Sequence, residues 1–239
     1  MLQHERQQEI LRYLADHPSA SVEEIAATIY VSPSTARRDI IALEEKGFVS
    51  RLYGGVMLAD HKNGTVPAAL REDAFSADKE AVARQAAARI GHGAVIFADG
   101  SSTVRRVFKY VEADNVTVIT NNTRIFEEYG TDKRFTLYST AGRFDVRNHV
   151  FVGPAAGLSL AQYHADIALF SSQGISKEGV SDASEEETAL RRTMLDRAAR
   201  RIFLCDGSKI GIRKAHLLCT LDEIDEIICN IPLPKELEL

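Results

Sequence analysis

The chain has 239 residues, of which 45% are hydrophobic, and a formal net charge of −5 at pH 7, values typical of a water-soluble protein with one small and one larger globular domain. No uninterrupted apolar run approaches the roughly 18 residues of a membrane span, and the start of the chain does not resemble a signal peptide, so we expect a cytoplasmic protein. Three cysteines in apolar segments and seven scattered histidines argue against a disulfide framework and a metal site, and we expect no metal and no cofactor.

Residues 1–58 are predicted to form a winged helix-turn-helix domain of three short helices and a β-hairpin. Both ends of the third helix are marked, because Ser32 can cap its first turn and Gly47 can adopt the left-handed conformation that ends it. The following residues alternate as a strand up to Gly54-Gly55, which can turn the chain into a return strand, the wing. A domain of this kind places its third helix in the major groove of DNA.

Arg37 and Arg38 lie on the outward face of the third helix, and neither has an acidic residue three or four positions away. Guanidinium groups free of partners can bind phosphates or guanine edges, although a solvated arginine pair on a surface helix is the ordinary alternative. The residues that we expect to contact DNA are Ser32, Ser34, Thr35, Arg37, Arg38, Arg51 and Tyr53. Up to Gly55 six cations face eight acids, so one domain alone should bind weakly, and we expect a homo-oligomer that presents at least two.

The third helix and the wing resemble the signature of the DeoR family of bacterial transcriptional regulators. The resemblance is carried by Val31-Ser32, Arg37-Arg38-Asp39, Leu43-Glu44, Gly47, Arg51 and Gly54-Gly55. The rest of the chain is similar to that family's C-terminal effector domain, which is related in fold to sugar-phosphate isomerases. The resemblance implies a DNA-binding regulator, and specifically a repressor of carbohydrate-metabolism genes, that responds to a phosphorylated sugar.

Residues 59–67 are polar and carry Gly and Pro, which predicts a linker, and the second domain is expected over residues 68–239. In that domain strand-length apolar runs alternate with helical stretches. We expect helices over residues 77–90, 103–112, 124–129, 154–163 and 185–199, and strands over 94–98, 116–119, 135–139, 167–170 and 202–205. This alternation predicts an α/β fold, in the form of a larger Rossmann-like domain with a mostly parallel sheet.

Polar residues follow three of these strands, at the edge where an open parallel sheet binds its ligand. The first group, residues 99–103, offers hydroxyls and free amides at a helix N-terminus, which can bind a phosphate or form an ordinary helix cap. The second group, residues 120–122, offers side-chain amides and a hydroxyl, which can bind sugar hydroxyls or cap the next helix. The third group places Lys209 beside Asp206, where the lysine can bind a phosphate or form a local ion pair. Arg143 is added as an anion contact, although an exposed loop arginine is the commoner case. The predicted effector site is Asp99, Gly100, Ser101, Ser102, Thr103, Thr120, Asn121, Asn122, Arg143, Asp206 and Lys209.

Two other functions use the same residues. An active sugar-phosphate isomerase or deaminase fused to a DNA-binding module would need a carboxylate base. The candidates for its proton transfers are Asp99, Asp182, Asp206 and Lys209. The Lys-Gly and Glu-Lys pairings by which those isomerases resemble one another are missing, so we expect binding without turnover and no catalytic residues. A sensor of a nucleotide or another anion would use the same predicted effector site.

Ser184 and Glu187 are predicted to form a capping box with a structural role.

Overall fold

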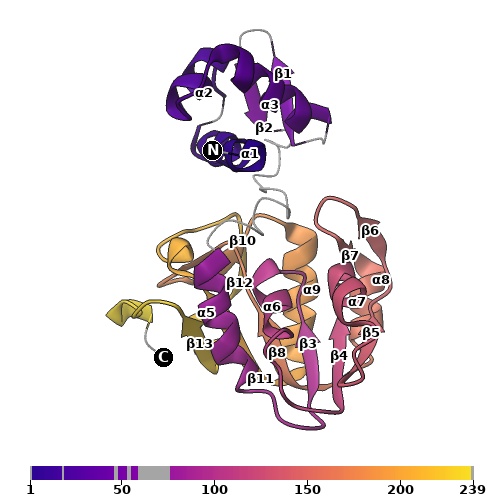
Figure 1. Cartoon of the computed structure of the whole chain (residues 1–239). Coiled ribbons are helices and arrows are strands. Elements are labelled where there is room, and N and C mark those ends of the chain that lie inside the picture. Colours follow the sequence, from indigo (N-terminus) through magenta and orange to yellow (C-terminus); the bar gives the residue numbers. More distant parts are fainter. Residues whose placement is uncertain (1, 18, 46–47, 53–54, 59–75, 238–239) are drawn as a thin grey trace. The chain divides into compact units, whose positions relative to one another are not determined.

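The computed structural model describes residues 2–17, 19–45, 48–52, 55–58 and 76–237 (Figure 1). Backbone contacts divide the chain into two compact units, Met1–Ala74 and Phe75–Leu239. The linker predicted at residues 59–67 lies outside the described residues. In the described part of the chain, no helix combines the length and the apolar character needed to cross a bilayer.

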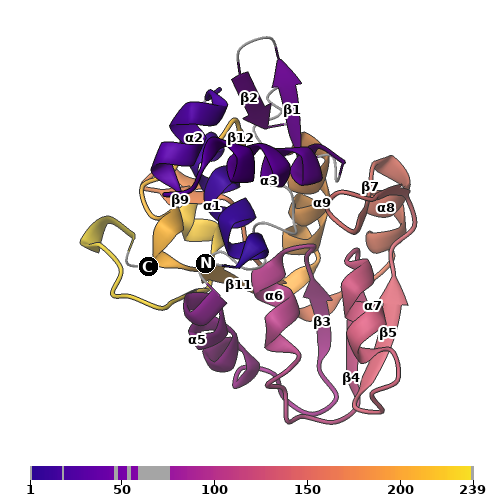
Figure 2. The ribbon, with the colours of Figure 1, turned by 45° about the horizontal axis from the view of Figure 1, so that its top comes forward.

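The small unit consists of three helices and a two-stranded hairpin. Its elements are α1 (Gln3–Asp16), α2 (Val22–Thr28), α3 (Pro33–Glu45), β1 (Val49–Leu52) and β2 (Gly55–Leu58). Ser21 and Glu24 form a capping box at the start of α2, since the Glu24 amide donates to Ser21 Oγ (3.1 Å) and the Ser21 amide to Glu24 Oε2 (2.8 Å). The strands pair antiparallel, and α3 lies next to the hairpin (Figure 2). The predicted winged helix-turn-helix fold is therefore confirmed.

The large unit is built on a sheet of six parallel strands in the order β13-β11-β8-β3-β4-β5. The strands are β3 (Val95–Ala98), β4 (Val116–Thr120), β5 (Phe135–Ser139), β8 (Ala165–Phe170), β11 (Ala198–Cys205) and β13 (Glu226–Cys229). Numbered along the chain, this order is 3-2-1-4-5-6 read from the β5 edge, which is the Rossmann order. The chain reverses direction across the sheet between β3 and β8, and ligands of such sheets bind beyond this switch point.

Helices cover both faces of the sheet. They are α5 (Ser76–Ala87), α6 (Ser102–Val107), α7 (Thr123–Tyr129), α8 (Pro154–Leu160) and α9 (Glu185–Asp196). Ile96 and Ala98 of β3 join the core that includes α5, α6 and α7, whereas Phe97 joins the core that includes α8 and α9. Successive residues of a strand point to opposite faces, so a strand buried on both sides reads as a continuous apolar run. The predicted α/β fold with a mostly parallel, covered sheet is confirmed.

The structure corrects several predicted boundaries and adds short elements. Helices α5, α6 and α8 end at Ala87, Val107 and Leu160, before the predicted ends at residues 90, 112 and 163. Helix α9 ends at Asp196, and Ala198, predicted to be helical, begins β11, where it pairs with Ala165 of β8. Tertiary pairing here overrides the high helix propensity of alanine. The added antiparallel strands are β6 (Arg143–Asp145), β7 (Val150–Val152), β9 (Gly174–Ser176), β10 (Gly179–Asp182) and β12 (His216–Cys219). The 3-10 turns are η1 (Gly207–Lys209), η2 (Leu221–Glu223) and η3 (Lys235–Leu237).

Candidate functional site

Three hydroxyl groups gather at the start of α3. The Thr35 amide donates to Ser32 Oγ (3.2 Å), so Ser32 caps the helix as the sequence predicts. The hydroxyls of Ser34 and Thr35 lie 2.9 and 3.0 Å from the same Ser32 oxygen. Ser32 and Ser34 are exposed and Thr35 is half-buried. The end of α3 that a helix-turn-helix domain presents to DNA therefore carries several exposed donors and acceptors.

Arg37 and Arg38 are exposed on α3 and form no ion pair with any described residue, whereas the next residue, Asp39, is buried. Asp39 accepts two hydrogen bonds from Arg6 of α1, to Oδ2 from Nε (2.6 Å) and to Oδ1 from Nη2 (3.2 Å). The hydrogen bond to Asp39 raises the pKa of Arg6 above its ordinary value. This forked pair ties α3 to α1 and fixes which face of α3 points outward. Sequence reasoning missed Arg6, because its partner is 33 positions away.

Of the two wing residues predicted to contact DNA, the structure describes Arg51 but not Tyr53. Arg51 Nε pairs with Glu44 Oε2 of α3 (2.6 Å), and the Arg51 amide also donates to Glu44 (3.3 Å). The pair is half exposed, and such pairs contribute at most about 1 kcal/mol, so DNA can displace it. Arg51 thus ties the wing to α3 in the free protein, which sequence reasoning did not foresee. Tyr53 lies outside the described residues.

In the large unit, Asp99 joins the two strands at the switch point of the sheet. It follows β3 and is fully buried. Its Oδ1 accepts from the Ser101 amide (2.9 Å), and its Oδ2 accepts from the amide of Ser171, the residue after β8 (3.0 Å). The carboxylate predicted to contact an effector is therefore occupied by backbone amides of two neighbouring loops.

A buried arginine that sequence reasoning missed completes this arrangement. Arg191 of α9 donates from Nε to Asp99 Oδ2 (2.7 Å), from Nη1 to Asp182 Oδ2 (2.9 Å) and from Nη2 to Glu187 Oε2 (2.8 Å). Its side chain is 3% exposed. Burial opposes the charge, but the carboxylates of Asp182, Asp99 and Glu187 raise the pKa of Arg191. We call these four residues the Arg191 cluster; only the spacing of Glu187 and Arg191, four residues apart on a helix, pointed to it in the sequence.

The cluster also changes the interpretation of the start of α9. Ser184 caps the helix, since its hydroxyl accepts from the Glu187 amide (3.3 Å). The Glu187 carboxylate binds Arg191, however, and the Ser184 amide donates to Asp182 Oδ1 (3.2 Å). The predicted capping box is therefore wrong in its second half, because a buried guanidinium is a stronger partner for a carboxylate than a backbone amide.

The loop after β3 has the features of an ordinary cap. Ser101 Oγ accepts from the Val104 amide (3.1 Å) at the start of α6, Ser102 is half-buried and Thr103 is buried. Gly100 is required by close packing, since a Cβ there would lie 2.4 Å from Cγ1 of Val150. In the protein without ligand, the Ser101 hydroxyl therefore acts as a helix cap, which is the alternative role that the sequence analysis gave this loop.

The loop after β4 keeps an unused acceptor. Thr120 Oγ1 accepts from the Asn122 amide (3.0 Å), and Asn122 Oδ1 caps α7 by accepting from the Arg124 amide (3.0 Å). Asn121 differs from them. Its Nδ2 donates to the Phe151 carbonyl (3.1 Å), while its Oδ1 is buried and has no hydrogen-bond partner among the described residues. A buried acceptor without a partner is costly, which is a reason to look for a donor from a ligand or a water.

Lys209 closes the switch point from the β11 side. Its Nζ donates to Ser171 Oγ (2.6 Å) and lies 3.4 Å from Asp206 Oδ2, and its side chain is 14% exposed. Burial would raise the pKa of Asp206, but Lys209, with the Ser208 hydroxyl and Lys79, lowers it below the ordinary value. The ends of β3, β8 and β11 therefore meet through Asp99, Ser171 and Lys209.

Arg143 is not gathered into that group of contacts. It lies on β6 with a side chain that is 63% exposed, and its Nη2 pairs with Glu186 Oε2 (2.6 Å). Among the described residues, no group of three or more His, Cys, Asp or Glu side chains is arranged to hold a metal ion.

Two family descriptions match the chain, a DeoR-like helix-turn-helix domain over residues 6–62 and the DeoR C terminal sensor domain over residues 74–230. The chain belongs to the DeoR family. A relative, the HTH-type transcriptional repressor GlcR of Bacillus subtilis (strain 168), is 32% identical over 230 residues, which cover 96% of this chain and 89% of GlcR. The L-fucose operon activator of Escherichia coli (strain K12) is 30% identical over 228 residues, 94% of each chain. This DeoR-family member is thus a transcriptional regulator with a DNA-binding domain and a sensor domain.

Solved structures resemble the chain more weakly. The delta subunit of eIF2B from Chaetomium thermophilum has a TM-score of 0.49 at 13% identity, over 69% of this chain and 59% of that chain. A D-ribose-5-phosphate isomerase in complex with phospho-erythronic acid has a TM-score of 0.41 at 15% identity, over 55% of this chain and 52% of that chain. Neither likeness bears on what this chain binds.

Proposed function

We propose that this regulator is a cytoplasmic repressor of carbohydrate-metabolism genes, which binds its operator as a homo-oligomer and is released by a phosphorylated sugar bound at the switch point of the large unit. The DNA-binding part of this proposal is supported by the exposed Arg37 and Arg38 side chains, which lie on a helix that the Arg6–Asp39 ion pair holds in place. Repression is chosen over activation because GlcR, named a repressor, is 32% identical, and the activator is 30% identical.

The operator contact is tested with DNA that the protein itself selects. Full-length protein is used to enrich a duplex from a random-sequence pool, and binding to that duplex is measured for the wild type, Arg37→Ala and Arg38→Ala. A bidentate contact from arginine to guanine is worth about 1–3 kcal/mol, so each variant should bind the selected duplex markedly more weakly. Lys133→Ala removes an exposed cation of the large unit and serves as the control. Unchanged affinity in both arginine variants would contradict the recognition face.

The effector half is supported by Lys209 and Asn121. The Lys209 ammonium, held between Ser171 and Asp206, can turn toward a phosphate, because its three N–H donors rotate on a flexible stem. Asn121 supplies a buried acceptor without a donor, which a sugar hydroxyl would satisfy. Together they suit a ligand that carries an anionic group and hydroxyl groups. The capping groups of Ser101, Thr120 and Asn122 then shape the loops around it.

Binding without turnover is part of the proposal. A general base must be free to accept a proton in the reacting complex. The Asp99 and Asp182 carboxylates both accept a hydrogen bond from the buried Arg191 guanidinium, so the protein itself already engages them. The isomerase or deaminase alternative therefore lacks a free base at these two positions.

Thermal-shift screening separates these functions. Purified protein is tested with phosphorylated sugars, the same sugars without phosphate, and nucleotides, and each stabilising compound is then assayed for conversion. A sugar phosphate should raise the melting temperature without forming product, by an amount that grows with its concentration over Kd. Lys209→Met should abolish the shift while Lys133→Ala retains it. Steady product formation would favour the enzyme, and a shift with nucleotides alone would favour a nucleotide sensor.

A further inference from the structure

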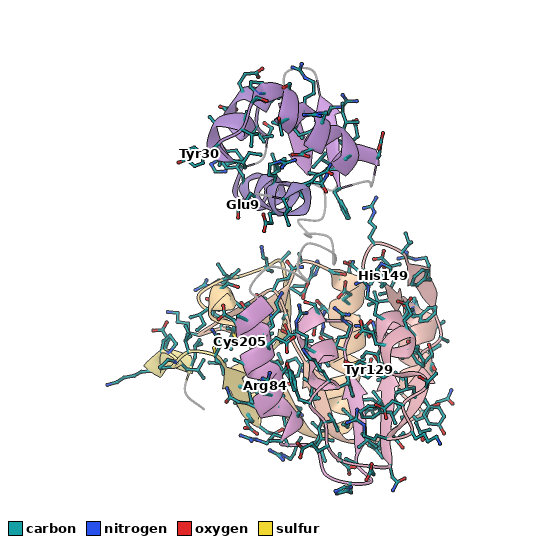
Figure 3. All side chains as sticks on the ribbon, in the orientation of Figure 1. Glu9, Tyr30, Arg84, Tyr129, His149 and Cys205 are labelled. Carbon is teal, nitrogen blue, oxygen red and sulfur yellow. The ribbon has the colours of Figure 1, made fainter. Side chains whose placement is uncertain are left out.

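Tyr30 is an exposed aromatic residue in a backbone conformation that does not suit it. It lies between α2 and α3, its side chain is 94% exposed, and its φ of 54° falls in the left-handed region. Figure 3 shows the side chain extending outward from the small unit. Residues other than glycine and asparagine rarely adopt this conformation, and a large exposed ring gains little by burial. Stability of the fold therefore does not explain a tyrosine here.

The backbone around Tyr30 explains the conformation but not the side chain. The Tyr30 amide donates to the Ala27 carbonyl (3.3 Å) and the Val31 amide to the Ala26 carbonyl (3.0 Å). These two bonds are those of a Schellman motif, which ends a helix with one left-handed residue, most often glycine. The end of α2 thus requires a left-handed residue at position 30, and glycine would fill it without strain.

The position of Tyr30 in the helix-turn-helix indicates which kind of group its side chain can contact on DNA. Tyr30 lies two residues before Ser32, the cap of the helix that carries Arg37 and Arg38. In such domains the helix before the recognition helix crosses the DNA backbone, so the turn between them passes close to phosphates. Tyrosine hydroxyls are among the groups that donate hydrogen bonds to phosphate oxygens and fix the register of a protein on DNA.

We propose that Tyr30 is a DNA-backbone contact whose hydroxyl donates a hydrogen bond to a phosphate beside the groove entered by α3. This inference rests on the proposed DNA-binding function. It makes Tyr30 a positioning residue, because a phosphate contact is present on every sequence and leaves base discrimination to α3.

The experiment compares Tyr30→Phe, which removes only the hydroxyl, with Tyr30→Gly, which removes the side chain and relieves the left-handed backbone. Tyr138→Phe, at an exposed tyrosine of β5, is the matched control. The probes are the duplex enriched from the random pool by the wild type and a scrambled duplex of equal length. Tyr30→Phe should weaken binding to both by about tenfold, as expected for one hydrogen bond to a charged group, and should leave their affinity ratio unchanged.

Two further readouts distinguish a phosphate contact from a structural role. Tyr30→Gly should weaken DNA binding yet raise the melting temperature of the protein, because a strained residue is replaced by one that fits. The slope of log K against log salt should stay the same in Tyr30→Phe, since a neutral hydroxyl displaces no counterion, but should fall by about one in a variant that loses a cation that neutralises a phosphate.

Wild-type affinity for both duplexes in Tyr30→Phe and Tyr30→Gly would overturn the inference while leaving the proposed function intact. Loss confined to the selected duplex would also overturn it, because Tyr30 would then discriminate bases. Failure of the wild type to enrich or bind any duplex would refute the proposed function, and the Tyr30 contact with it.

Discussion

Replacing Arg191 by methionine would remove the guanidinium that faces three buried carboxylates and would keep most of the volume of the side chain. Asp99, Asp182 and Glu187 lie 2.7 to 2.9 Å from its nitrogens, and the Arg191 side chain is 3% exposed. Removing one partner of a buried ion pair costs about 3–5 kcal/mol, because the remaining charge is left buried without compensation. We expect the large unit of the variant to lose stability in that range, a large part of the 5–15 kcal/mol (roughly) that stabilises a typical domain.

The assay is urea unfolding of the full chain, followed by far-UV circular dichroism. Arg192→Met is the matched control, since Arg192 is the next residue of α9 and pairs with Asp196 and Glu223 at a partly exposed position. Exposed pairs contribute about 0–1 kcal/mol, so this variant should change the midpoint little. A loss in Arg191→Met no greater than that in Arg192→Met would refute the conclusion that the buried Arg191 cluster stabilises the large unit.

Three further outcomes follow from other contacts. Asp39→Asn should lower the urea midpoint of the small unit and weaken binding to the selected duplex, with effector-induced thermal shifts unchanged, because the carboxylate that positions α3 is lost. Gly100→Ala should cost about 1–3 kcal/mol in urea unfolding, since the added methyl would meet Val150 at 2.4 Å. Burial would raise the pKa of Asp206, but Lys209, the Ser208 hydroxyl and Lys79 together lower it below its ordinary 3.8. Asp206 should therefore stabilise the protein fully above that value, and this contribution should be lost as pH falls through the lowered pKa. Unfolding in an acid pH series, with Asp206→Asn as comparison, should show a weaker decline in the variant.

The elements of the small unit were predictable because their signals are local. Ser21, Glu24 and Ser32 mark helix starts within a few residues, and the Ser32 cap is present as predicted. The parallel strands were also predictable, since strands buried on both faces read as continuous apolar runs. Strands such as β9 and β10, of three and four residues, show no periodicity over so short a length and were missed.

The chemistry of the switch point was less predictable, because it depends on distant partners. Asp99 was identified from its place after a strand, but its partner Arg191 is 92 positions further along the chain. Ser171, which bonds both Asp99 and Lys209, follows β8 and is not among the predicted site residues. Sequence position thus indicates which residues reach the sheet edge. It does not tell which of them are already paired there.

The two sides of the switch point differ in how easily their contacts can be exchanged. On one side the Arg191 guanidinium is buried and shared by three carboxylates, so a ligand gains nothing there that the protein does not already supply. On the other, the Lys209 ammonium is partly exposed and bonds a hydroxyl that also donates to the Leu204 carbonyl. A phosphate offers that ammonium a stronger partner than a neutral hydroxyl. An effector can shift a conformational equilibrium only through contacts that differ between the two states. In the mechanism that we propose, the contacts of Lys209 with Ser171 and Asp206 are the ones that the effector would change, while the Arg191 cluster would stay fixed.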